Sequence, residues 1–139
     1  MNAKEYLSQA YRIDQRINSK LAQVMSLRDL LGKATGTLSG APKAASPNPH
    51  SMEEIIAKMV DLEGEINDDI DALVDLKAEI MRRIKRVENT EYQTILELRY
   101  LCFNRWEEIA VELGYTQRHL LRMHDLALES ICVPWAVER

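Results

Sequence analysis

The chain has little of what secreted proteins, membrane proteins and large enzymes are built from. Only 6% of its 139 residues are aromatic, and it has two cysteines, five glycines and four prolines. The two thiols, Cys102 and Cys132, are too few for a disulfide framework, which predicts a reduced, cytoplasmic protein. No apolar run approaches the roughly 18 residues of a membrane span, and the N-terminus has no apolar signal segment, so we expect neither secretion nor membrane insertion.

The charge and the motifs narrow the function classes further. A formal net charge of -4 excludes a histone-like positive coat, so any contact with nucleic acid must come from a local basic patch. The acidic run between Asp61 and Asp75 lacks His or Cys partners and is interpreted as a solvated helix face rather than a metal site. No phosphate-cradling glycine loop, zinc-ligand spacing or nucleophile elbow is present, so we expect no enzyme, no cofactor and no metal.

What the sequence does have is helical periodicity, and 46% of its residues are hydrophobic. Apolar residues recur every seven positions in residues 2–31 and again in the segment that begins with a capping box at Ser51. The first stripe consists of Ala10, Ile17, Val24 and Leu31, and the second of Met52, Met59, Ile66, Leu73, Ile80 and Val87, with Ile56, Leu62, Ile70, Leu76 and Ile84 as companions. The pattern predicts an all-α protein whose residues 1–88 form a long antiparallel helical hairpin, a coiled coil.

Residues 32–50, GKATGTLSGAPKAASPNPH, interrupt this pattern with three prolines and three glycines. They are predicted to be a flexible linker between the two helices. Because two helices alone bury little apolar surface, we expect the hairpin to form a homodimer.

Residues 89–139 are predicted to form a three-helix module with a helix-turn-helix. Asn89 and Thr90 provide a break and a cap before a helix over 91–101. A second helix starts at Trp106, which is expected to plug the core, and ends at Gly114, which is expected to have a positive φ. Thr116 then caps a third helix.

The third helix is amphipathic, and its outward face carries the candidate DNA contacts. Its buried arc is predicted to contain Leu120, Met123, His124, Ala127 and Ile131, and its outward arc Arg118, His119, Arg122, Asp125 and Glu129. His124 is therefore expected in the core, and Cys102 is expected to be buried as a small apolar residue. The predicted DNA-binding residues are Arg105, Thr116, Gln117, Arg118, His119 and Arg122. The alternative for each of these side chains is an ordinary solvated surface.

The segment ILELRYLCFNRWEEIAVELGYTQRHLLRMHDLALESI resembles region 4 of sigma-70-type factors. The matching features are LxLRY at Leu96–Tyr100, the WEEIAVELG stretch at Trp106–Gly114, the Thr116 cap, His124, and the pair Ala127 and Leu128. The whole chain also resembles small sigma-70 region 4-like regulators of phages and prophages of Gram-positive bacteria, relatives of the ArpU and RinA late-gene activators.

The resemblance implies a transcription regulator that binds double-stranded DNA in the cytoplasm of a bacterial host cell. Two alternatives stay open. One is an adaptor that binds host RNA polymerase, and the other is a DNA-packaging recognition subunit similar to phage small terminases.

Overall fold

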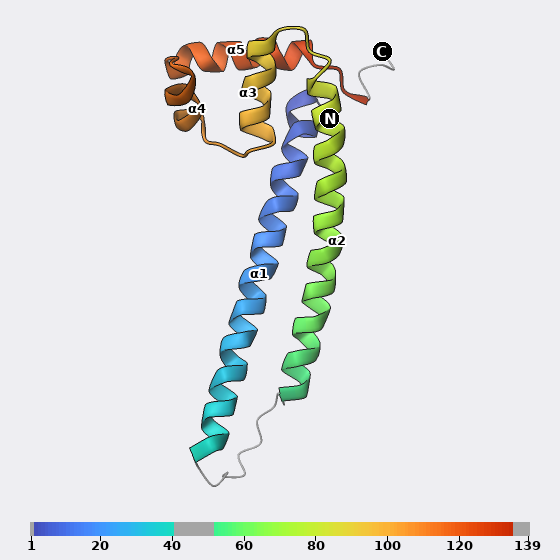
Figure 1. Ribbon diagram of the computed structural model, residues 1–139, viewed down its shortest axis with the longest axis vertical. Helices are drawn as coiled ribbons and strands as arrows, with labels where there is room; N and C mark the ends of the chain where they lie inside the picture. Colours follow the sequence, from blue (N-terminus) through green and yellow to red (C-terminus); the bar gives the residue numbers. More distant parts are fainter. Residues whose placement is uncertain (1, 41–51, 135–139) are drawn as a thin grey trace. The chain divides into compact units, whose positions relative to one another are not determined.

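The computed structural model describes residues 2–40 and 52–134, and most of these residues are helical, with no strand among them (Figure 1). The prediction of an all-α protein is confirmed. The five helices of the described ranges are α1 (Ala3–Gly40), α2 (Met52–Ile84), α3 (Thr90–Tyr100), α4 (Trp106–Leu113) and α5 (Gln117–Ser130). None of these described helices has the length and apolarity that a membrane crossing requires.

The first helix ends later than predicted, which corrects the proposed linker over 32–50. Residues 32–40 belong to α1, and the rest of that linker, with Ser51, lies outside the described residues. A helix can continue through Gly32 because a glycine costs only about 1 kcal/mol relative to alanine.

The chain divides into two compact units at other positions than the predicted boundary at residues 88 and 89. Unit 1 combines Met1–Ile13 with Ala72–Arg139, and unit 2 is Asp14–Asp71. The start of α1 and the end of α2 share a core with α3 and α5.

Unit 2 pairs a stretch of α1 with a stretch of α2 in opposite directions. The Lys20 ammonium lies 2.7 Å from a carboxylate oxygen of Asp69 and 3.3 Å from one of Glu65, and the Arg16 guanidinium lies 3.8 Å from Asp69. The hydrogen bond from Lys20 holds the pKa of Asp69 below its ordinary value. Since later residues of α1 pair with earlier residues of α2, the two stretches run antiparallel.

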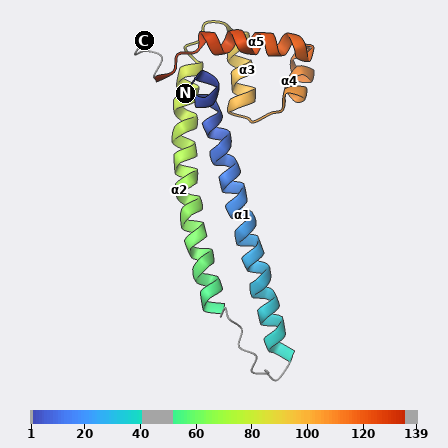
Figure 2. The same cartoon turned by 180° about the vertical axis from the view of Figure 1, so that it is seen from behind.

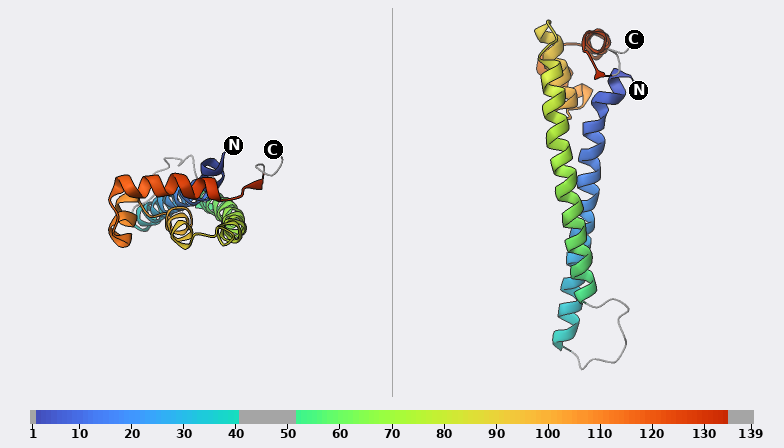
Figure 3. Two further views of the ribbon diagram at one scale, coloured as in Figure 1. Left: turned by 90° about the horizontal axis from the view of Figure 1, so that it is seen from above. Right: turned by 90° about the vertical axis from the view of Figure 1, so that its right-hand side faces the viewer.

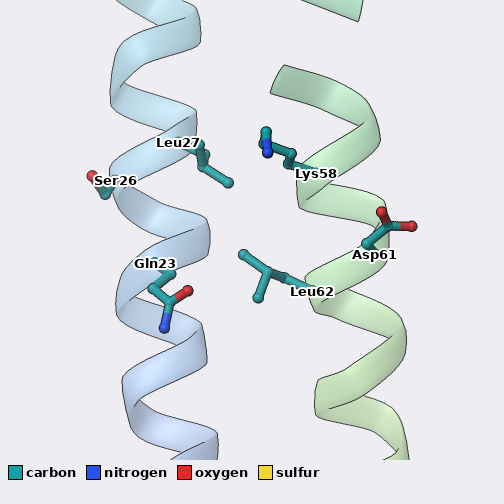
Figure 4. Close-up of a pocket in the computed structure, with 6 residues that line it drawn as sticks. All are labelled: Gln23, Ser26, Leu27, Lys58, Asp61 and Leu62. Atoms are coloured by element: carbon teal, nitrogen blue, oxygen red, sulfur yellow. The ribbon is translucent and has the colours of Figure 1, made fainter. Parts of the chain in front are cut away.

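A hollow with a volume of about 440 Å³ opens between the two helices of unit 2 (Figure 4). Leu27 and Leu62 point toward each other across it, and Gln23, Ser26, Lys58 and Asp61 complete its lining. The four polar residues of this lining are all exposed to solvent: Gln23, Ser26, Lys58 and Asp61. The lining therefore offers no buried polar group for a ligand.

The apolar stripe of α2 is narrower than predicted. Ile66 and Ile80 are buried, but Ile56 and Ile70 are 45% and 41% exposed, and Ile55 is buried in place of its neighbour. Residues at adjacent positions on a helix lie about 100° apart, so Ile55 and Ile56 belong to different faces. The predicted companions Ile56 and Ile70 are thus wrong for the buried face.

Unit 1 has two apolar clusters that share α3 and α5, and α5 lies across α3 with α4 close to the end of α5 where the turn joins them (Figures 2 and 3). The larger cluster joins Tyr6, Leu7, Ala10, Ile80, Ile84, Val87, Leu96, Tyr100, Ala127, Ile131 and Val133. The smaller joins Ile95, Ile109, Ala110, Leu120 and Met123. Together the two clusters bury one face of α5 along its length.

Candidate nucleic-acid interface

The turn between α4 and α5 is fixed by a glycine in the left-handed region. Gly114 has φ 77° and ψ 29°, as the sequence predicts for the residue that ends this helix. Its amide and that of Tyr115 both donate to the carbonyl oxygen of Ala110, at 2.9 and 3.0 Å. Both bonds go to one of the last carbonyl groups of α4, which have no amide partner further along the helix. The direction in which α5 leaves the turn is therefore set by backbone hydrogen bonds.

The first turn of α5 is capped and tied to α3. Thr116 Oγ1 accepts from the amide of His119 at 3.1 Å, which confirms the predicted cap. The Tyr115 hydroxyl donates to Glu91 of α3 at 2.6 Å, and the Tyr115 ring lies edge-on to the His119 ring at a centroid distance of 5.1 Å. A cap of this kind is worth about 1 kcal/mol. The start of α5 is thus stabilised both by the Thr116 cap and by the contacts of Tyr115 with Glu91 and His119.

The two faces of α5 are divided as the sequence predicts. All five residues assigned to the buried arc are buried: Leu120, Met123, His124, Ala127 and Ile131. The outward residues Arg118, His119, Arg122, Asp125 and Glu129 are all exposed. Thr116 and Gln117 are exposed as well. The predicted contacts from Thr116 to Arg122 thus form one surface, the recognition face, on the first two turns of α5.

Arg105 belongs to a different feature. It precedes α4, its side chain is 76% exposed, and its guanidinium Nε lies 3.8 Å from Glu108, whose carboxylate also accepts from the Arg105 amide at 2.8 Å. Glu108 thereby caps the start of α4. An ion pair this exposed is worth less than about 1 kcal/mol, so the Arg105 charge can still meet an anion.

Arg105 lines a basic recess of about 280 Å³ together with residues of α1 and α3. Its lining consists of Lys4, Ser8, Tyr11, Arg99, Tyr100, Phe103 and Arg105, none of them from α5. Arg99 is held in place because it donates to the carbonyl oxygen of Asn104 at 3.0 Å and stacks over the Trp106 ring at 4.6 Å. Sequence reasoning missed Lys4 and Arg99, since no local pattern places residue 4 beside residue 99. The recess therefore offers a second cluster of positive charge, which suits an anionic group.

Cys102 is exposed, which corrects the prediction that it is buried. The helix α3 ends at Tyr100, and Cys102 follows in the turn, where its amide donates to Glu97. Phe103 takes the place beside the core instead, with φ 61°. The helical spacing on which the prediction depended stops two residues too early.

Trp106 and His124 meet at the boundary of the smaller cluster. Trp106 is half-buried, so it covers the core rather than filling it, and its ring lies edge-on to the His124 ring at a centroid distance of 4.5 Å. His124 Nε2 is 2.6 Å from the Tyr100 hydroxyl. Burial lowers the pKa of His124 to about 4 and raises that of Tyr100 to about 12, so both side chains are neutral at pH 7.

Replacing Gly114 with alanine is expected to destabilise the protein by about 1–2 kcal/mol, because a β-carbon disfavours a positive φ. An added β-carbon meets nothing within 4 Å there, so the cost is one of backbone strain alone. Gly64 in α2 is equally open but helical, and Gly64→Ala is the matched control, expected to stabilise by about 0.5–1 kcal/mol. Gly114→Asn should lose less than Gly114→Ala in urea unfolding. Equal losses for Gly114→Ala and Gly114→Asn would contradict the left-handed turn.

Comparison with known proteins adds no relative, because no protein-family model, curated protein or solved structure matches the chain. Among the residues that the structure describes, no group of three or more His, Cys, Asp or Glu side chains is placed to hold a metal ion. The candidate site is therefore characterised by its geometry and charge alone.

Proposed function

We propose that the protein is a phage-type transcription regulator that binds double-stranded DNA through a helix-turn-helix formed by α4 and α5. The observation that carries the proposal is the recognition face. Its side chains are exposed and polar, while the opposite side of the same helix is buried in the core. A helix that enters the major groove needs this combination, because the side chains that contact the bases must be exposed while the opposite face packs rigidly against the rest of the protein.

The distribution of charge along α5 favours an approach led by its N-terminus. Arg118 and Arg122 are one helical turn apart on the recognition face, whereas Asp125 and Glu129 follow on the later turns. Phosphate groups attract the first pair and repel the second. The amide groups at the start of a helix add partial positive charge at the same end. Thr116, Gln117 and His119 supply hydrogen-bonding groups there.

The resemblance to sigma-70 region 4 supports the same assignment. We further propose that the protein acts as a homodimer in the cytoplasm of a bacterial host cell, with the long helices of residues 1–88 as a coiled-coil hairpin that sets the dimer. Two helix-turn-helix modules related by a twofold axis would read a pseudo-palindromic or repeated site. In this arrangement Arg105 and the basic recess contact phosphate rather than bases.

The double variant Arg118→Ala/Arg122→Ala is expected to weaken binding to duplex DNA by one to two orders of magnitude, because each arginine loses a phosphate or base contact. The slope of log affinity against log salt should fall by about 2 if both contacts are to phosphate. Affinity is measured by fluorescence anisotropy across salt, first with random-sequence duplexes and then with sequences selected from that pool.

The matched control is Arg12→Ala/Arg28→Ala, which removes the same charge from exposed positions of α1. It is expected to leave the affinity and the salt slope unchanged. If the control and the α5 double variant lose affinity equally, the recognition face is not the DNA contact.

A second candidate function is that of an adaptor for host RNA polymerase. It is favoured by exposed apolar side chains on the same two helices: Val111 is 83% exposed, and Leu121 and Leu126 are each 43% exposed. Exposed apolar side chains suit a protein partner better than a phosphate backbone. Capture of polymerase by the Arg118→Ala/Arg122→Ala variant, with no DNA binding by the unaltered protein, would select the adaptor over the DNA-binding regulator.

A further inference from the structure

The helix α2 carries a second apolar row that nothing in the described chain covers. Ile56, Val60, Ile70 and Val74 are between 41% and 60% exposed, although they lie beside the buried residues of the same helix. Single exposed apolar side chains are ordinary on a protein surface, but an aligned row of them is not.

The row is part of a regular seam. Along α2, eight residues alternate three and four positions apart, each one position after a residue of the stripe that faces α1. This outer seam consists of Glu53, Ile56, Val60, Glu63, Asn67, Ile70, Val74 and Lys77. The Lys77 ammonium at its end also lies 4.5 Å from the centre of the Phe103 ring of the same chain. Alternation of three and four is the spacing of a coiled-coil contact, so α2 has one such face toward α1 and a second one about 100° around the helix.

The order of residue types in the outer seam is the same read in either direction. From the first residue it runs charged, two apolar, two polar, two apolar, charged, and the end residues Glu53 and Lys77 have opposite charges. A surface that is to meet its own copy about a twofold axis must be self-complementary in this way.

We propose that the outer seam is a self-association surface on which α2 of a second copy of this chain packs antiparallel. Ile56 then lies opposite Val74 of the second copy, and Val60 opposite Ile70. Glu63 and Asn67 meet in the centre, where the amide can donate to the carboxylate, and Glu53 meets Lys77 at each end. Every apolar residue is covered by an apolar one, and every polar residue by a polar one.

Charge selects this arrangement over the others. A shift by one heptad would set Val60 against Lys77 and Glu63 against Val74, which buries charges without partners. A parallel, in-register pairing would set Glu63 against Glu63, and the end charges against like charges, which is destabilising. The polar centre thus fixes orientation and register, as a buried polar residue does in coiled coils.

The inference rests on the homodimer of the proposed function and names the surface that makes it. The dimer is tested without DNA, so a failure of the proposed dimer surface leaves the proposed DNA binding untouched. Conversely, unchanged DNA binding by the arginine variants leaves the proposed dimer surface untouched.

The first test is the solution mass of the full chain, measured by sedimentation equilibrium at micromolar concentration. The unaltered protein is expected at twice its chain mass of 16.0 kDa. Val60→Asp/Ile70→Asp sets four carboxylates against one another and should raise the dimer dissociation constant at least 100-fold. Val111→Asp on α4, also at an exposed valine, is the control that should stay dimeric, and equal helical circular dichroism shows that each variant folds.

The second test fixes the register by disulfide trapping, in chains whose exposed Cys102 and Cys132 are replaced by serine. A mixture of Val60→Cys and Ile70→Cys chains should cross-link on mild oxidation, and neither chain alone should do so. Cross-linking of each chain with itself would overturn the antiparallel register. A monomer, a ring of many subunits, or a dimer unaffected by the aspartates would overturn the outer seam as the interface.

Discussion

Replacing Leu7 with alanine is expected to lower the free energy of unfolding by about 3 kcal/mol, within the usual range of about 2–5 kcal/mol for a buried leucine. Leu7 has no exposed surface and belongs to the core cluster that also contains Ile80, Leu96 and Ala127. Removing its three outer carbon atoms leaves a cavity between elements that are far apart in the sequence. A residue near the N-terminus is therefore expected to control the stability of the C-terminal helices.

Leu126→Ala is the matched control, since Leu126 lies in the same unit as Leu7 but is 43% exposed. It should lose less than about 1 kcal/mol, because little cavity forms at a half-solvated position. Trp106 fluorescence in a Trp135→Phe background reports unfolding of unit 1, and each variant is compared with that background in urea. If Leu7→Ala and Leu126→Ala lose equal stability, residues 3–13 are not part of the core of unit 1.

The local features of the fold could be predicted from the sequence because each has a local cause. Gly114 ends α4 since only glycine adopts a positive φ without strain, and Thr116 caps α5 through its own hydroxyl. The buried arc of α5 followed from the spacing of its apolar residues, and His124 was placed correctly on that arc.

The partners of each helix could not be predicted, because periodicity shows which face is apolar and not what covers it. Tyr6 and Leu7 lie outside the heptad stripe predicted for the first helix, yet both are in the core of unit 1. In the opposite sense, Ile56 and Ile70 fit the predicted stripe of the second helix but are exposed. When a helix has two apolar faces, its sequence pattern does not show which of the two is buried in the fold.

The candidate site divides in the same way. The residues of the recognition face are close in sequence and are exposed as predicted, because a single helix and its cap bring them together, and their contact with DNA stays a prediction. The basic recess was missed because Lys4 and Arg99 are joined only by tertiary packing. Cys102 was misplaced since α3 ends just before it.

Acidification is expected to destabilise the protein through His124 by about 3 kcal/mol between pH 6.5 and pH 4. The folded protein holds the pKa of this imidazole at about 4, below its ordinary value of 6.5, because the ring is buried. Between pH 6.5 and pH 4, His124 therefore binds a proton in the unfolded chain but stays neutral in the folded protein. The contribution is fully present above pH 6.5 and is lost as the pH falls toward 4, at about 1.4 kcal/mol per pKa unit.

His124→Leu is the variant that isolates this contribution, because it keeps an apolar side chain in the core and removes the titrating group. The measurement is the difference between the urea-unfolding free energies of the two proteins at each pH, in which the titration of the carboxylates cancels. That difference should change by about 3 kcal/mol from pH 7 to pH 4, and parallel profiles would show that the ring titrates as in the unfolded chain.

The same titration should reach the recognition face. His124 of α5 contacts both Tyr100 of α3 and Trp106 of α4, so a protonated ring would separate α5 from these two helices. DNA binding by the unaltered protein is then expected to fail at a higher pH than DNA binding by His124→Leu, although the leucine removes a potential positive charge. Loss of binding at the same pH in both proteins would show that acid acts on the exposed side chains rather than on the core. Stability of the core and the presentation of Arg118 and Arg122 would in that case be independent.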